Sequence, residues 1–223
     1  ISFENTDLGN CWKLAAASNL QDLKSFASGF FEVQDYGSQA VADMIPAQNG
    51  QSWWDACSGA GGKSLFLADK FPDINLLCTD TRESILVNLS ERIARSKCRG
   101  IKSGVLDATK EIPKSIPFNG VLVDAPCSGS GTWSRNPENL VFFEESRLAH
   151  YSNTQSAILN NVSRALTSGS FLVYMTCSLF AMENEDVILP FAQSVEYHLI
   201  VQELIYGYEQ DSDSLFIAVL RKN

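Results

Sequence analysis

The chain has 223 residues, of which 45% are apolar and 19% are charged. This composition is typical of a globular domain and excludes a disordered chain. No apolar run approaches the roughly 18 residues of a membrane span, and the start lacks the features of a signal peptide. The formal charge of −9 argues against tight binding of nucleic acid by this chain alone, although an enzyme that contacts nucleic acid locally stays open.

The first 46 residues are predicted to form a short helical extension, because apolar residues recur at helical spacing over 20–31 and 38–44. From residue 47 to 223, short apolar runs alternate with helical stretches. Predicted strands cover 51–57, 74–79, 101–106, 120–124 and 170–176, and predicted helices cover 63–71, 82–97, 148–166 and 183–192. Two closing strands, 197–204 and 215–220, are expected to pair. This order predicts an α/β domain with a doubly wound, Rossmann-like sheet, mostly parallel with an antiparallel closing strand.

The six cysteines stand at positions 11, 57, 78, 98, 127 and 177, and no two have the Cys-x-x-Cys spacing of a zinc knuckle or redox pair. A chain of this size needs no disulfides to fold. We therefore expect reduced thiols, no bound metal and a cytoplasmic protein.

A glycine-rich loop follows the first predicted strand, in the segment Cys57-Ser58-Gly59-Ala60-Gly61-Gly62-Lys63. Sheets of this kind bind ligands beyond the carboxyl ends of their strands. The glycines allow the backbone to approach a ligand closely, and the N-terminus of the next helix favours an anionic group. The loop predicts a nucleotide-like cofactor, with a structural glycine turn as the alternative.

Carboxylates follow the next two predicted strands, at Asp80 and Asp107. A carboxylate at the position of Asp80 can accept hydrogen bonds from a ribose diol. Either residue could instead cap the following helix. Together with the loop, the two carboxylates favour a mononucleoside cofactor, adenosine with a short tail, over a dinucleotide.

Cysteines stand at the ends of three strands that should be neighbours in the sheet, at Cys57, Cys127 and Cys177. We expect their thiols to lie along one edge, beside the cofactor loop. One buried cysteine is usually a small apolar residue, whereas three at neighbouring strand ends indicate chemistry.

These features resemble the catalytic domain of the bacterial 16S rRNA methyltransferase B and Nol1-Nop2-Sun family over nearly the whole chain. The matching segments are Val33-Gln34-Asp35 with Ser38-Gln39, Asp55 to Ser64, Asp124 to Gly131, Thr176-Cys177-Ser178 with Glu183-Asn184-Glu185, and Phe216-Ile217-Ala218 with Arg221-Lys222. Members are S-adenosylmethionine-dependent RNA cytosine-5 methyltransferases. The resemblance therefore implies a Rossmann-like methyltransferase fold, S-adenosyl-L-methionine as cofactor, and rRNA or tRNA as substrate.

The resemblance also implies roles for individual residues. Cys177 adds to carbon 6 of the target cytosine, Cys127 assists release, and Asp124 contacts ring nitrogen 3. The implied cofactor-binding residues are Cys57, Ser58, Gly59, Ala60, Gly61, Gly62, Lys63, Asp80, Asp107 and Asp124, and the implied substrate-binding residues are Pro126, Arg135 and Asn136. Arg135 is expected to hold a phosphate, with a solvated surface charge as the alternative.

Some positions depart from the family pattern. Ser58-Gly59-Ala60 replaces Ala-Ala-Pro in the cofactor loop, and Ile85 replaces an arginine, yet both motif cysteines and the cofactor carboxylates are kept. We also expect the RNA-binding module that precedes the catalytic domain in many members to be absent or shortened here.

Three other interpretations compete with this one. A DNA cytosine-5 methyltransferase would use the Pro-Cys motif as nucleophile and would need no cysteine at 177. A non-catalytic methyltransferase-like RNA-binding or assembly factor is supported only by the altered loop. A nicotinamide-dependent oxidoreductase explains neither cysteine motif.

Overall fold

The computed structural model describes residues 3–9, 11–14, 19–114, 117–194 and 197–223. Its main feature is a seven-stranded sheet in the order β5-β4-β3-β6-β7-β9-β8. The strands are β3 (Ser52–Asp55), β4 (Asn75–Asp80), β5 (Ile101–Val105), β6 (Phe118–Asp124), β7 (Leu166–Thr176), β8 (Tyr197–Ile205) and β9 (Leu215–Lys222). The strands from β5 to β7 are parallel, and β9 runs antiparallel between β7 and β8. The predicted mostly parallel sheet with an antiparallel closing strand is confirmed.

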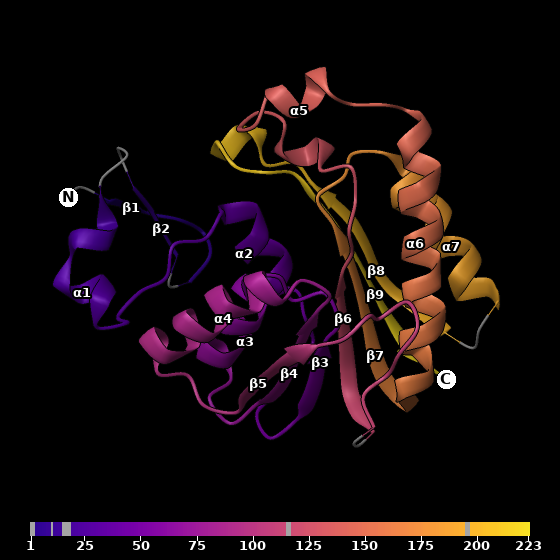
Figure 1. Cartoon of the computed structure of the whole chain (residues 1–223), viewed down its shortest axis with the longest axis horizontal. Helices are drawn as coiled ribbons and strands as arrows, with labels where there is room; N and C mark the ends of the chain where they lie inside the picture. Colours follow the sequence, from indigo (N-terminus) through magenta and orange to yellow (C-terminus); the bar gives the residue numbers. More distant parts are fainter. Residues whose placement is uncertain (1–2, 10, 15–18, 115–116, 195–196) are drawn as a thin grey trace.

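Helices cover both faces of the sheet (Figure 1). One face carries α2 (Tyr36–Asp43), α3 (Gly62–Lys70) and α4 (Glu83–Ser96), and the other carries α6 (Ser146–Val162) and α7 (Glu185–Ser194). Successive strand residues point to opposite faces, so Trp53 packs in the core beneath α2 and α3 while Trp54 packs in the core beneath α6. The two cores explain why the central strands β3, β6 and β7 are apolar on both faces.

The N-terminal extension is less helical than predicted. β1 (Phe3–Asn5) and β2 (Trp12–Leu14) form a two-stranded antiparallel hairpin that the sequence did not indicate. The single helix expected over 20–31 is wrong, because the chain forms a 3-10 turn at Leu20–Asp22 and the four-residue α1 (Lys24–Ala27). Gly29 then adopts a φ of +74°, and a Cβ at this position would lie 1.9 Å from the carbonyl oxygen of Arg95. Close packing against the end of α4 therefore interrupts the helix.

The second helix predicted in this region is confirmed as α2. The carboxylate of Asp35 accepts the backbone N–H of Ser38 at 3.2 Å and caps the helix. Val41 and Ala42 are fully buried against the sheet. The division of the chain at residue 46 stays a prediction.

Among the described residues, no helix has both the length and the apolar character needed to cross a membrane. All six cysteines are free thiols.

Candidate functional site

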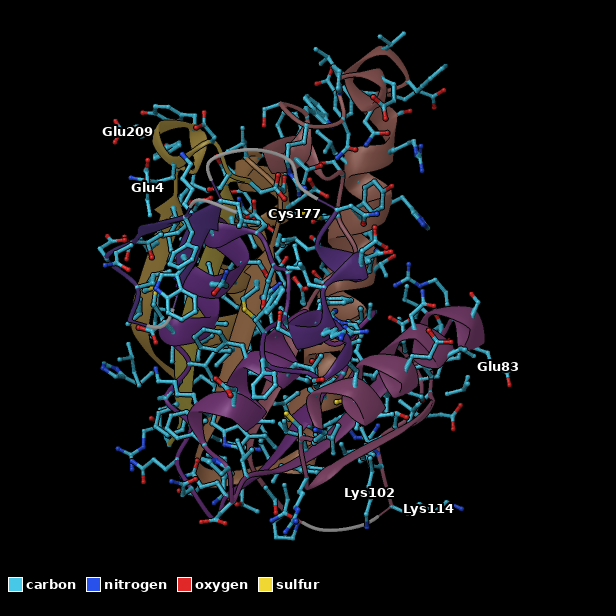
Figure 2. The ribbon with its side chains drawn as sticks, turned by 90° about the vertical axis from the view of Figure 1, so that its left-hand side faces the viewer. Glu4, Glu83, Lys102, Lys114, Cys177 and Glu209 are labelled. Atoms are coloured by element: carbon cyan, nitrogen blue, oxygen red, sulfur yellow. The ribbon has the colours of Figure 1, made fainter. Side chains whose placement is uncertain are left out.

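Three parallel neighbours, β3, β6 and β7, bring their carboxyl ends to one edge of the sheet. Register fixes this alignment, since Asp55 of β3 pairs with Leu122 of β6, and Asp124 pairs with Met175 of β7. The loops that follow these strands therefore meet, as the sequence predicted for Cys57, Cys127 and Cys177. Figure 2 shows Cys177 in the interior of the view, whereas Glu83 and Lys102 lie at its periphery.

Two of the three predicted thiols are in direct contact. The Sγ atoms of Cys127 and Cys177 lie 3.3 Å apart. The hydrogen bond from Cys127 lowers the pKa of Cys177 and the charge of Lys63 adds to this, whereas burial and the charges of Asp124 and Asp213 oppose it; the net pKa is lowered. The same hydrogen bond and burial raise the pKa of Cys127 well above the range of an ordinary thiol. The arrangement favours a thiolate at Cys177 beside a protonated Cys127.

The third thiol, Cys57, differs from this pair. Burial, followed by the charges of Asp55, Asp124 and Asp80, raises its pKa well above the ordinary value. A thiol that keeps its proton is a poor nucleophile. Cys57 is therefore suited to lining the loop and not to attacking a substrate.

Lys63 and Asp124 form an ion pair at the same edge. Lys63 Nζ lies 2.7 Å from Asp124 Oδ2, and Lys63 is 8% exposed. Burial alone would lower the pKa of Lys63, but the charge and hydrogen bond of Asp124 outweigh it, so the net pKa is raised. The pair joins the first turn of α3 to the end of β6.

The glycine-rich loop has the geometry of a ligand cradle. Gly61 adopts a φ of +79° as the N-cap of α3, and a Cβ there would lie 2.2 Å from Leu89 Cδ1, so the turn requires glycine. Two buried polar atoms of this region, Asp55 Oδ1 and Ser58 Oγ, have no protein hydrogen-bond partner. Buried polar atoms are normally satisfied, so the loop fits a bound polar group such as the expected cofactor.

The two predicted cofactor carboxylates differ in what holds them. Asp80 is 6% exposed, and its Oδ2 accepts the backbone N–H of Gly59 at 3.0 Å, which ties it to the cofactor loop. Burial would raise its pKa, but hydrogen bonds from Arg82 lower it, so it stays ionised. Asp107 instead binds residues of the turn that follows it. Hydrogen bonds from Lys110 and Thr109 to its carboxylate lower its pKa to about 2.

The predicted substrate residues lie in the loop between β6 and α5 (Glu138–Val141). The guanidinium of Arg135 forms a two-point ion pair with Asp213, one hydrogen bond measuring 2.7 Å from Nε to Oδ1. The Arg135 side chain stays 53% exposed, so both the phosphate contact and the solvated surface charge stay predictions. Asn136 donates to the carbonyl oxygen of Thr132 at 3.4 Å, and the carbonyl oxygen of Pro126 accepts from Gln155 at 3.0 Å.

Sequence reasoning missed two contributors to this edge. It assigned no partner to Arg135, because Asp213 is 78 residues away and no local pattern links them. It noted Glu183 only as part of a motif, whereas the structure buries this side chain completely between the two cysteine loops. The position of Glu183, an acidic residue in the motif that follows the candidate nucleophile Cys177, was the one sequence signal that pointed to a role at the site. Among the described residues, no cluster of His, Cys, Asp and Glu could hold a metal ion.

The amino-acid sequence of the chain is similar to those of known methyltransferases. Ribosomal RNA small subunit methyltransferase B of Proteus mirabilis is 28% identical over 223 residues, which cover 99% of this chain and 53% of that protein. Its counterpart from Salmonella paratyphi A is 30% identical over 195 residues, which cover 86% of this chain and 45% of that protein. The chain thus spans about half the length of the curated relatives it matches.

Solved structures share the fold. The crystal structure of PH0851 has a TM-score of 0.93 at 25% identity and covers 99% of this chain and 54% of that chain. NSun6 from Pyrococcus horikoshii, solved with the S-adenosylmethionine analogue SFG, has a TM-score of 0.83 at 24% identity and covers 95% of this chain and 57% of that chain. The family described as 16S rRNA methyltransferase RsmB/F matches residues 42–221, which include the large sheet up to the last residue but one of β9 and both motif cysteines. By that match, the chain belongs to the RsmB/F family of 16S rRNA methyltransferases.

Proposed function

We propose that this chain is the catalytic part of an RNA cytosine-5 methyltransferase that acts on rRNA or tRNA. The observation that carries the proposal is the thiol pair, with Cys127 Sγ and Cys177 Sγ 3.3 Å apart and their pKa values shifted in opposite directions. A methyltransferase that acted on an oxygen or an amine would have no use for two thiols at the ligand-binding edge.

The chemistry of cytosine explains the need for a thiolate. Carbon 5 of the ring is a poor nucleophile, and addition of the Cys177 thiolate to carbon 6 gives it the electron density to take up a methyl group. S-adenosylmethionine, the cofactor of this family, supplies that methyl group from its sulfonium when bound. The base must leave its stacked position to reach Cys177, which costs a few kcal/mol.

The other residues at the edge have supporting roles. Lys63 favours the Cys177 thiolate and holds Asp124, to which we assign the contact with ring nitrogen 3. The loop from Cys57 to Gly62 carries the methionine end of the cofactor, and Asp80 the ribose. We assign Asp107 to the adenine, and Arg135, Asn136 and Pro126 to the RNA.

Release requires two bonds to break. Solvent water takes the hydrogen on carbon 5 as a proton, and the electrons of that C–H bond form the double bond between carbons 5 and 6. The bond between Cys177 Sγ and carbon 6 breaks at the same time, and its electrons leave with the sulfur as the Cys177 thiolate. Cys127 lies within hydrogen-bond distance of the sulfur that departs. We assign it to this step, in which it assists the departure of Cys177.

Substitution of each cysteine tests the assignment. Cys177→Ala should abolish formation of 5-methylcytosine in RNA while binding of S-adenosylmethionine stays within about threefold, since the thiol acts on the base and not on the cofactor. Isotope-labelled methyl transfer to total RNA, followed by nucleoside mass spectrometry, measures the first property, and calorimetry measures the second. Wild-type turnover in Cys177→Ala would overturn the proposed nucleophile, and product other than 5-methylcytosine would overturn the proposed reaction.

A further inference from the structure

A buried carboxylate joins the two loops that carry the candidate catalytic thiols. Glu183 lies between β7 and α7, at the end of the 3-10 turn Ala181–Glu183, and is 0% exposed. Its Oε1 accepts the backbone N–H of Ser128 at 2.7 Å and Nε2 of Gln155 at 3.4 Å. Its Oε2 accepts the hydroxyl groups of Ser128 and Ser178, each at 2.5 Å. Four donors from three separate segments therefore converge on one side chain.

The two serines directly follow the two cysteines. Ser128 follows Cys127 and Ser178 follows Cys177, so Glu183 fixes the residue next to each thiol. The two loops also meet through a backbone hydrogen bond of 2.8 Å from the N–H of Gly131 to the carbonyl oxygen of Cys177. A carboxylate only accepts hydrogen bonds, so it sets the direction of both serine hydroxyl groups. Because a buried carboxylate is costly without such partners, the loops and Glu183 depend on one another.

Asn184, the next residue of the same motif, holds one of these loops from the other side. Its Nδ2 donates to the carbonyl oxygen of Ser178 at 2.8 Å, and its Oδ1 accepts the hydroxyl of Thr176 at 2.5 Å. Asn184 thus orders the Cys177 loop alone, whereas Glu183 contacts both loops.

We propose that Glu183 is a positioning residue that holds Cys127 and Cys177 within hydrogen-bond distance of each other, so that Cys127 donates to the attacking sulfur of Cys177. The inference rests on the proposed function only in giving Cys177 the role of nucleophile. The hydrogen bond to Cys177 and burial raise the pKa of Cys127 most, and the charge of Glu183 raises the pKa of Cys127 further. The other ionisable groups that interact electrostatically with the thiol pair are Lys63, Asp124, Arg135, Tyr174 and Asp213.

Thiol chemistry in the absence of RNA tests this role. Glu183→Gln keeps the size of the side chain but loses the charge and one acceptor, while Asp186→Asn removes an exposed acid three residues away in α7. Two rates report on the thiols: formation of the Cys127–Cys177 disulfide with diamide, a two-electron thiol oxidant, and alkylation of Cys177 by iodoacetamide as a function of pH. Peptide mass spectrometry assigns both reactions to their cysteines.

Separation of the loops should impair both reactions. In Glu183→Gln we expect disulfide formation to slow by about tenfold or more and the alkylation profile of Cys177 to move up by about one pH unit. Binding of S-adenosylmethionine should stay within about threefold, and Asp186→Asn should behave as wild type. Wild-type disulfide and alkylation rates in Glu183→Gln would overturn the proposal, as would equal changes in Asp186→Asn.

A second variant covers the case in which Glu183→Gln does not fold. Ser178→Ala removes one of the four donors and leaves every charge in place, so it should slow disulfide formation by about threefold. Wild-type rates in Ser178→Ala would then overturn the proposal. Because these assays contain no RNA, a chain with the expected thiol behaviour but no 5-methylcytosine product would overturn the proposed function and leave the role of Glu183 standing.

Discussion

The carboxyl group of Asp55 lies at the end of β3, where the structure gives it little to offset its charge. It is 2% exposed, its Oδ2 accepts the hydroxyl of Ser64 at 2.6 Å, and its Oδ1 has no protein partner. Burial raises its pKa to about 7, with the hydrogen bond from Ser64 opposing the shift. The carboxyl group therefore titrates near neutral pH, beside the loop expected to hold the cofactor.

This shift predicts a pH dependence of stability. The folded state holds the proton of Asp55 more tightly than the unfolded state, so the stabilising contribution is present below the unfolded pKa and is lost as pH rises toward 7. Between pH 5 and pH 8 the loss attributable to Asp55 should be about 2–3 kcal/mol. Urea denaturation of wild type and Asp55→Asn at both pH values measures it, with Asp69→Asn, an exposed acid on α3, as the control. Equal pH dependence in wild type and Asp55→Asn would contradict the assignment.

At the scale of single elements, the turn from β3 into α3 depends on a glycine. Gly61→Ala puts a Cβ at a φ of +79° and against Leu89, so it should lower the free energy of unfolding by about 1–3 kcal/mol and weaken cofactor binding. Gly104 in β5 is the matched control, because a Cβ there would meet nothing within 4 Å. Chemical denaturation and calorimetry check both variants. A Gly61→Ala protein as stable as Gly104→Ala would show that the turn tolerates a side chain.

The elements also show how far sequence patterns reach. Alternating apolar runs predict the strands and the long helices from residue 51 onward. Their order predicts that Cys127 and Cys177 follow neighbouring strands, as they do in the structure. The prediction of a helix over 20–31 was wrong because Gly29 packs against the end of α4, and such a tertiary contact leaves no pattern in the local sequence. The hairpin β1–β2 has only three residues per strand, too few to show the alternation of apolar and polar residues that predicts a strand.

The same limit applies within the site. The resemblance to a family assigned roles to Lys63 and Asp124, but their ion pair links residues 61 positions apart and needed the fold to become visible. The pairing of Arg135 with Asp213 and the convergence of four donors on Glu183 are likewise products of tertiary structure. Patterns along the chain identify strand ends, whereas contacts across them depend on side-chain packing.

Over the whole molecule, the charge of −9 limits how strongly this chain can hold RNA. Phosphate binding depends on lysine and arginine, and none lies between Arg164 and Arg221. We predict that the 223-residue chain binds RNA with a Kd above about 1 µM at about 150 mM salt. Fluorescence anisotropy with labelled RNA measures the affinity. Nanomolar binding by this chain would contradict the prediction and show that it holds its substrate without a further RNA-binding module.

Trapping of the covalent intermediate tests whether Cys177 attacks the base and Cys127 assists its release. Cys127→Ala should form an adduct with RNA in the presence of S-adenosylmethionine, because attack proceeds while release is impaired. The adduct is detected as a protein–RNA band that survives SDS electrophoresis, and it should vanish in Cys127→Ala/Cys177→Ala. An adduct that persists in Cys127→Ala/Cys177→Ala would show that neither thiol is the nucleophile. An adduct that forms in Cys177→Ala but not in Cys127→Ala would exchange the roles of the two thiols.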